Sequence, residues 1–529
     1  MQNHKKIGTL VALAILISGC GSSGSSGGST TTDVTNSLAT AYPSDLAVTS
    51  PTASSTASGN LSVKATIKPP TISEKKQHMV DLLNGTKKSD CTFSFDMTAS
   101  PPYASCYGPS INYSNHPDAS GGQSPSGQMP SGDLGIWTAT ESTTGEACVA
   151  ARLNYVVGQI MTNVNMATDM GAAILCGANV AGKSLPEKGV TEDLTTVSQD
   201  VMTTNAIPMT VTSATLARDA SDSSDGPVYT MSITGSVSFS PPGQSAQNSN
   251  FTMTLKHIPK STADNSTYKG RLNMKMAHDT TAANFFGLGN CGDVLSGPTT
   301  TDILDAFSIE YTKSSETSLT YVLKRAEFCG ADEPAPFDAQ GNVDLTNKHD
   351  GTKKNGWANN GNYQIASFNP QDGTGNYAFA WQAGSRGGNS RALDVTVTNS
   401  GTEGCGYFGF GPDIAETSGV GGITKMICNW AGPGQGPAGG KAGVVKAQRE
   451  CFKKSDTIFV VDATTDSSRS LAITYAPTLT CDKTAANFTY QNVDGRTDDN
   501  DSTDGAAVTN NLISWDGSLF TVPTASTVP

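Results

Sequence analysis

The stretch Tyr229-Thr230-Met231-Ser232-Ile233-Thr234-Gly235-Ser236-Val237-Ser238-Phe239 decides the fold class. Apolar residues and one glycine alternate along it with Ser and Thr, and a period of two places the two sets on opposite faces of a β-strand. Similar alternation surrounds Met253, Met274, Ile309 and Tyr321. These segments predict an antiparallel meander with one solvated face. The apolar face must be covered by another sheet, by a helix or by a ligand.

The C-terminal part of the chain predicts shorter strands between Gly-rich loops, with a spacing that suits a sandwich or jelly roll. The stretch Gly404–Gly411 fits either a buried strand or an exposed loop. The strand candidates are 363–368, 377–381, 392–398, 457–461, 471–475 and 512–520.

Helical periodicity is confined to the region before the meander. Apolar residues at steps of three and four predict a helix from Ala147 to about Ile174, and Ser73 to Asn84 predicts a short one. We therefore expect a mainly β protein. Its predicted divisions are a leader at 1–19, an acylated Cys and flexible tether at 20–70, a helix-containing disulfide-bonded unit at 71–190, an antiparallel meander at 191–330 and a Gly-rich sandwich-like domain at 331–529.

Eleven cysteines are present, and ten of them follow Cys20, an even set that predicts five disulfides in an exported protein. An unbroken helix would separate Cys148 from Cys176 by about 42 Å, too far for a disulfide. Each would then pair elsewhere, with Cys91 and Cys106 as candidates, unless a break in the helix brings them together. A pairing of Cys91 with Cys106 would instead staple the loop-rich segment between them. No C-x-x-C motif occurs, which argues against haem attachment and zinc ribbons.

The N-terminus has the features of an export signal. Lys5 and Lys6 precede the apolar run Ile7–Ile17, which is too short to span a bilayer permanently. The sequence Ile17-Ser18-Gly19-Cys20 then resembles the lipobox of bacterial lipoproteins. The resemblance implies that Cys20 becomes the first residue and carries acyl chains such as palmitate, which anchor the protein in a membrane. Gly21 resembles the residue of lipoproteins sorted to the outer membrane; the leaflet stays open.

Composition and charge restrict the classes of partner that the protein is expected to bind. The 529-residue chain has 34 Lys and Arg against 47 Asp and Glu, and loss of the leader with its two lysines changes the net charge from −13 to −15. This acidic balance argues against nucleic-acid binding and against attraction to anionic lipid. The Gly-, Ser- and Thr-rich stretch from Gly21 to Lys68 predicts a tether with a reach of roughly 40 Å.

Three motifs suggest chemistry, but their contexts favour ordinary structure. The stretch 177–184 matches G-x-x-x-x-G-K-[ST], yet Pro186 and Gly189 follow where a phosphate-binding loop needs a helix. We therefore expect no nucleotide there. The six histidines lack zinc-site spacing and are predicted to lie in surface loops. The acidic stretch 494–505 partly follows the spacing of a calcium loop, and a solvated acidic turn is the expected form.

We therefore expect a lipid-anchored envelope or cell-surface protein with a non-enzymatic binding or structural role. No residue is assigned to catalysis, to a cofactor or to a metal, and Cys20 is the one predicted modification site. One alternative is a carrier of lipid or another apolar ligand, suggested by Met231, Met253, Met274 and Met276 on the apolar face of the meander. Another is an envelope polysaccharide hydrolase, which would need two carboxylates across a cleft.

Overall fold

The computed structural model describes the parts of the chain on which the following account rests. The described residues are 37–46, 80, 83, 91, 136–137, 153, 158–205, 207, 209–239, 247–278, 303–329, 336–339, 341–343, 357–383, 390–410, 443–444, 449–455 and 458–461.

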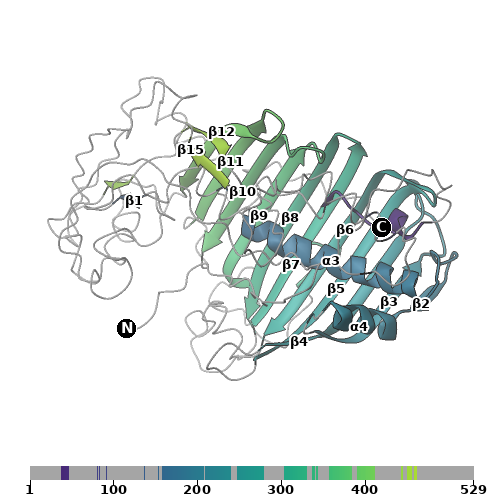
Figure 1. The fold of residues 1–529 in the computed structure, drawn as a ribbon. Helices are drawn as coiled ribbons and strands as arrows, with labels where there is room; N and C mark the ends of the chain where they lie inside the picture. Colours follow the sequence, from purple (N-terminus) through teal and green to yellow (C-terminus); the bar gives the residue numbers. More distant parts are fainter. Residues whose placement is uncertain are drawn as a thin grey trace, which may run out of the picture.

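Thirteen antiparallel strands form a single sheet, in which almost every strand lies beside its neighbours in sequence (Figure 1). The prediction of a mainly antiparallel β fold is confirmed. The separate pair β1 (Ile136–Trp137) and β13 (Gly443–Val444) forms a small second sheet. The strands of the large sheet are β2 (Thr191–Asp193), β3 (Met209–Arg218), β4 (Tyr229–Phe239), β5 (Gln247–Ser261), β6 (Asp264–His278), β7 (Ile303–Ser315), β8 (Ser318–Cys329), β9 (Trp357–Phe368), β10 (Gly375–Ala383), β11 (Ser390–Thr398), β12 (Glu403–Phe410), β14 (Arg449–Ser455) and β15 (Ile458–Val461).

The sheet continues across the boundary expected near residue 330. β8 pairs with β9, with Leu319 opposite Phe368 and Tyr321 opposite Ala366, so the apolar faces of the two regions lie on the same side. The described strands of 191–330 and 331–461 therefore form one sheet and not two facing sheets of a sandwich. The open alternative at Gly404 is resolved as well, because this residue lies in strand β12.

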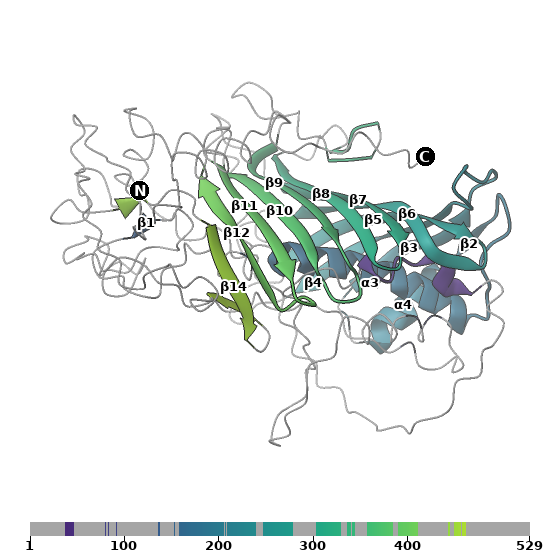
Figure 2. The same cartoon turned by 90° about the horizontal axis from the view of Figure 1, so that it is seen from above.

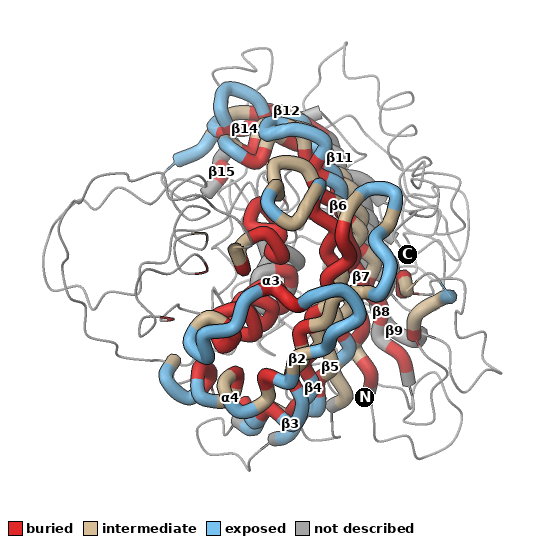
Figure 3. Tube along the Cα trace, turned by 90° about the vertical axis from the view of Figure 1, so that its right-hand side faces the viewer, coloured by how far each residue is buried: buried red, intermediate tan, exposed pale blue. Residues whose placement is uncertain are grey.

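A long helix covers the apolar face at one end of the sheet. α3 (Gly158–Val180) packs on β3, β4 and β5, and α4 (Thr195–Thr204) packs on α3 and β3. Figure 2 shows both helices on the same side of the sheet, and in Figure 3 α3 is mostly buried. A side chain at Gly171 would place its Cβ 3.1 Å from Leu255, so this glycine lets the helix approach the sheet closely. The predicted helix is present, and it extends to Val180.

An N-terminal segment covers the next part of the same face. The 3₁₀ turn η1 (Leu38–Ala41) and the residues after it contact β5, β6 and α3. Ser37 caps the turn, since its hydroxyl accepts a hydrogen bond from the Ala39 amide. Leu38, Tyr42 and Leu46 are buried in the core. We call residues 37–46 the clasp segment; they lie within the stretch that the sequence predicts to be a flexible tether.

Two disulfides join described residues. Cys91 pairs with Cys176 in α3, and Cys405 in β12 pairs with Cys451 directly opposite it in β14. Of the alternatives that the sequence left open, the pairing of Cys176 with Cys91 is confirmed, and the pairing of Cys91 with Cys106 is wrong. The reason is that the backbone at Cys91 lies beside α4, where its carbonyl accepts a hydrogen bond from Asn205. Several sequence-based expectations lie outside the described residues: Cys106, Cys148, Cys291, Cys428, Cys481, most of the short helix at 73–84, and the strands at 471–475 and 512–520.

Disulfide mapping tests this connectivity directly. Digestion of the unreduced protein followed by mass spectrometry should yield one linked peptide that contains Cys91 with Cys176 and another that contains Cys405 with Cys451. The same digest after reduction is the control. A linked peptide containing Cys91 and Cys106 would contradict the arrangement of α3 and the chain around Cys91.

Candidate functional site: a buried polar cluster beneath the clasp segment

Polar side chains occupy positions on the apolar face of the sheet where the alternation calls for hydrophobic ones. His257 follows Met253 and Leu255 along β5, and Lys313 follows Ile309 and Tyr311 along β7. Both side chains are buried, although histidine and lysine seldom are unless they have partners. Their partners come from the clasp segment and from β6.

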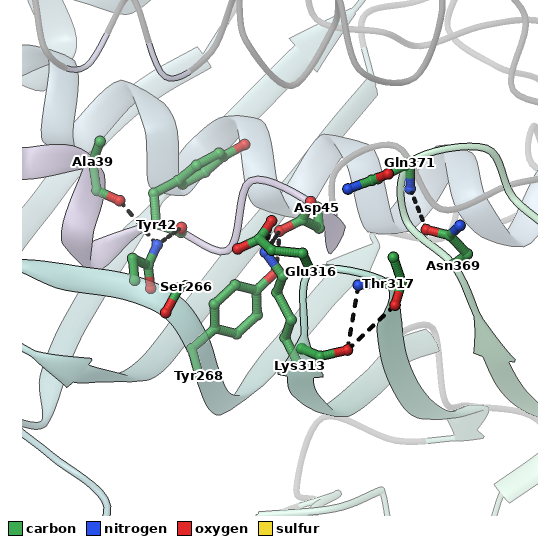
Figure 4. Close-up of polar contacts among 12 residues, drawn as sticks. Ala39, Tyr42, Asp45, Ser266, Tyr268, Lys313, Glu316, Thr317, Asn369 and Gln371 are labelled. Atoms are coloured by element: carbon green, nitrogen blue, oxygen red, sulfur yellow. Dashed lines mark hydrogen bonds and ion pairs between the residues drawn. The ribbon is translucent and has the colours of Figure 1, made fainter. Parts of the chain in front are cut away.

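The central contact is an ion pair between the clasp segment and the sheet. Lys313 Nζ lies 3.1 Å from Asp45 Oδ2, and the two side chains are 2% and 1% exposed. The hydroxyl of Tyr268 donates to the same carboxylate oxygen over 3.0 Å. Lys313 also contacts the exposed Glu316 at 3.2 Å. Figure 4 shows these groups gathered beside the Tyr268 ring. A buried ion pair needs such extra hydrogen bonds to offset its desolvation.

A second set of contacts holds the backbone of the clasp segment. The Asn265 amide nitrogen donates to the carbonyl oxygens of Ala39 and Tyr42, at 3.2 and 2.9 Å. The Asn265 oxygen therefore faces His257 Nε2, 2.8 Å away, and we assign the proton to Nε2. His257 Nδ1 lies 3.1 Å from the Tyr311 hydroxyl, whose single proton is shared between Nδ1 and the Lys256 carbonyl oxygen 3.2 Å away. His257 is neutral in this arrangement, and burial lowers its pKa from 6.5 to about 4.

A glycine makes room for this network. Gly270 lies between His257 and Tyr311 in the register of the sheet. A Cβ atom at Gly270 would lie 2.2 Å from the Tyr311 hydroxyl oxygen and 2.3 Å from the Lys256 carbonyl oxygen. Without a side chain there, the Tyr311 ring lies across β6 and reaches His257.

The protonation states of the cluster suit it to holding a segment of chain. Burial raises the pKa values of Tyr268 and Tyr311, and burial together with the charge of Asp169 raises that of Tyr42. These phenols stay protonated near neutral pH. The cluster therefore presents a cation, hydroxyl donors and an amide to a segment that supplies a carboxylate and carbonyl oxygens.

The nucleotide-loop motif at 177–184 forms the end of a helix, as expected. Gly182 has a positive φ of 69°, and the amides of Ala181, Gly182 and Lys183 donate to carbonyls of the last turn of α3. Those amides are already hydrogen-bonded to the helix and do not point at a phosphate group. The carboxyl end of a helix also carries partial negative charge, which repels anions. Lys183 pairs with Glu192 at 2.8 Å.

The remaining predicted sites have mixed outcomes. The prediction that the histidines lie in surface loops is wrong for His257, whose buried ring is hydrogen-bonded to Asn265 and Tyr311, and for His278, which lies in strand β6. Cys20, His116 and the acidic stretch 494–505 lie outside the described residues. The described residues contain no group of three or more His, Cys, Asp or Glu that could hold a metal ion.

The residues that suggested the alternative functions are also engaged in core packing or in ion pairs. Met231, Met253 and Met274 are buried in the core, and Gly171 of α3 lies close to the Met231 sulfur. Two carboxylates near the middle of the sheet are each bound by an arginine: Asp305 by Arg325 and Glu310 by Arg271. These two carboxylates lie on opposite faces of β7, so they cannot flank one glycosidic bond.

Sequence reasoning missed Asp45, Asn265, His257 and Lys313 as members of one cluster. A usable signal is the interruption of an apolar alternation by a charged residue at a core-facing position, as at Lys313 and at Arg325 after Leu323. Each interruption predicts a buried partner but does not identify it.

Comparison with known proteins gives no further guide to this cluster. No family model, no curated protein and no solved structure matches the chain.

Removing one member of the buried pair should destabilise the fold strongly. Lys313→Met leaves Asp45 buried without its cation, and we expect a loss of about 3–5 kcal/mol in the free energy of unfolding. The combined change Lys313→Met with Asp45→Asn should recover part of that loss. The matched control is Lys183→Met, which breaks a largely exposed pair and should cost about 1 kcal/mol or less. Urea denaturation measures all three; equal losses for Lys313→Met and Lys183→Met would contradict the burial of the pair.

Stability should depend on pH through His257. In the unfolded chain the imidazole of His257 is protonated below about pH 6.5. In the folded protein its pKa is about 4, so it stays neutral until the pH falls to that value. The free energy of unfolding should therefore fall as the pH drops through this window, by up to about 3 kcal/mol from this residue. Denaturant titrations from pH 7 to 4 should show a flatter dependence for His257→Gln than for the wild type. Identical slopes would mean that His257 is protonated in both states or in neither.

Proposed function

We propose that the protein is a lipid-anchored component of the bacterial envelope, carried by the outer membrane, with a binding or structural role and no catalytic one. The lipobox-like sequence Ile17–Cys20 supplies the anchor. The observation that carries the proposal is the clasp segment, because it ties the anchored end of the chain into the core of the sheet. Among the described residues, no helix is both long and apolar enough to cross a membrane.

The clasp segment changes how such an anchor would hold the body. Only residues 21–36 separate Cys20 from Ser37, and a flexible chain of that length reaches roughly 20–25 Å. The sheet would therefore stay close to the membrane surface, well within the roughly 40 Å expected of the longer tether. Tension on the lipid would act on the Asp45–Lys313 pair in the core.

The polar face of β3–β5 supports a binding or structural role. Ser213, Thr234 and Thr252 lie opposite one another across three strands, and Thr215, Ser232 and Thr254 form the next row. Ser213 and Thr234 are exposed. These rows present hydroxyl groups that can both donate and accept hydrogen bonds. A polar partner at the cell envelope is the class of ligand that such a surface favours.

Replacement of the acylated residue tests the anchor. Cys20→Ser should abolish incorporation of labelled palmitate and move the protein from the membrane fraction to the soluble fraction, because no acyl chain can be attached. The control Ser23→Ala keeps Cys20 and should behave as wild type. Retention of the Cys20→Ser protein in membranes after a high-salt wash would refute anchoring by lipid.

A further inference from the structure

The clasp segment is held in the way that a protein holds a peptide ligand. It is not a strand of the sheet. Its polar contacts to β6 and β7 include two backbone carbonyls bound by Asn265 and one carboxylate bound by Lys313 and Tyr268, and its apolar side chains pack in the core. Tyr42 is completely buried beside these contacts. Residues 47–79 separate the segment from Val80, the next described residue.

We propose that His257, Asn265, Tyr268, Tyr311 and Lys313 form an exchangeable peptide-binding site. Its own clasp segment occupies the site in the structure, and the occupant that replaces it is the clasp segment of a second copy. Exchange between two copies would join them through reciprocal contacts, with each sheet holding the N-terminal segment of the other.

The chemistry of the site selects this segment. The occupant must place a carboxylate at Lys313, because otherwise the exposed Glu316 alone would have to offset the burial of this ammonium. It must also place an aromatic ring three residues earlier, as Tyr42 precedes Asp45. The pattern Tyr-x-x-Asp occurs once in the chain, at Tyr42-Pro43-Ser44-Asp45. A second copy therefore supplies the required groups in the required order.

The lengths of the sequences that flank the clasp segment determine how concentrated other copies must be before exchange occurs. Linkers of a few tens of residues give a tethered ligand an effective concentration on the order of millimolar. A segment from another copy competes when its own local concentration approaches that value. If the proposed anchor holds, copies crowded on one membrane would reach this regime sooner than the same number in solution.

Exchange can be tested on the full mature chain with Cys20→Ser, so that the result does not depend on lipid. A specific protease sequence is inserted after Ser58 and cleaved in the folded protein. A fluorescent peptide of residues 37–46 is then added, and anisotropy and native mass spectrometry follow replacement of the cleaved N-terminal fragment. We expect replacement by the wild-type peptide, and at least tenfold weaker competition by the Asp45→Asn peptide. A peptide of reversed sequence, with the same composition and charge, should not compete.

Two outcomes would overturn the exchange. The fragment could stay bound against a large excess of peptide, or the body could lose its folded circular dichroism spectrum as the fragment leaves; either would make the segment a permanent part of the core. Equal competition by the Asp45→Asn peptide would refute the selection by Lys313.

The exchange between copies is tested on the uncleaved chain. Sedimentation at protein concentrations up to about 1 mM should show dimers that excess peptide 37–46 dissociates. A chain that stays monomeric throughout would overturn the exchange between copies. Because this protein carries no lipid, failure here leaves the membrane anchor to be judged by the palmitate experiment alone.

Discussion

A sheet of thirteen strands with one apolar face must cover that face, and the rest of the structure follows from this constraint. α3 covers β3–β5, and the clasp segment covers the adjoining part of β5 and β6. The Cys91–Cys176 disulfide fixes α3 to a distant part of the chain. Within the described part of the chain, α3 and the clasp segment precede the whole sheet in sequence and α4 lies between β2 and β3, while the opposite face is polar on β3–β5.

The Asp45–Lys313 pair makes the position of the cover specific. Apolar contacts alone would tolerate a shift of the clasp segment along the sheet, because hydrophobic burial is not directional. The Asp45 carboxylate must meet the buried ammonium of Lys313, and a shift of the segment would separate the two charges. Asn265 adds to this by binding two backbone carbonyls whose spacing depends on the 3₁₀ turn. The polar contacts thus determine register, while Leu38, Tyr42 and Leu46 supply buried area.

Local pattern predicts local structure well in this chain and predicts pairing between distant segments poorly. The alternation at 229–239 matches β4 residue for residue, since period two is a property of the strand itself. The single sheet was not predictable from the same signal, because alternation does not say which strand lies next to which. The clasp segment was hidden for another reason: Tyr42 and Asp45 sit in a Ser-, Thr- and Ala-rich stretch whose composition indicates a linker. Their partners, Tyr268 and Lys313, are more than 200 residues away.

The meander also sets an order of events during synthesis. Neighbouring strands in the sheet are almost all neighbours in sequence, so each new strand can pair with the one before it as the chain emerges from its N-terminus. The clasp segment emerges before the strands of the sheet. Lys313 follows Asp45 by 268 residues, so the segment has no docking site until β7 has been made. The clasp segment consequently stays free of its binding site on the sheet until β7 has been made. If the proposed anchor holds, this is the period when a peptidase and an acyl transferase act at Cys20.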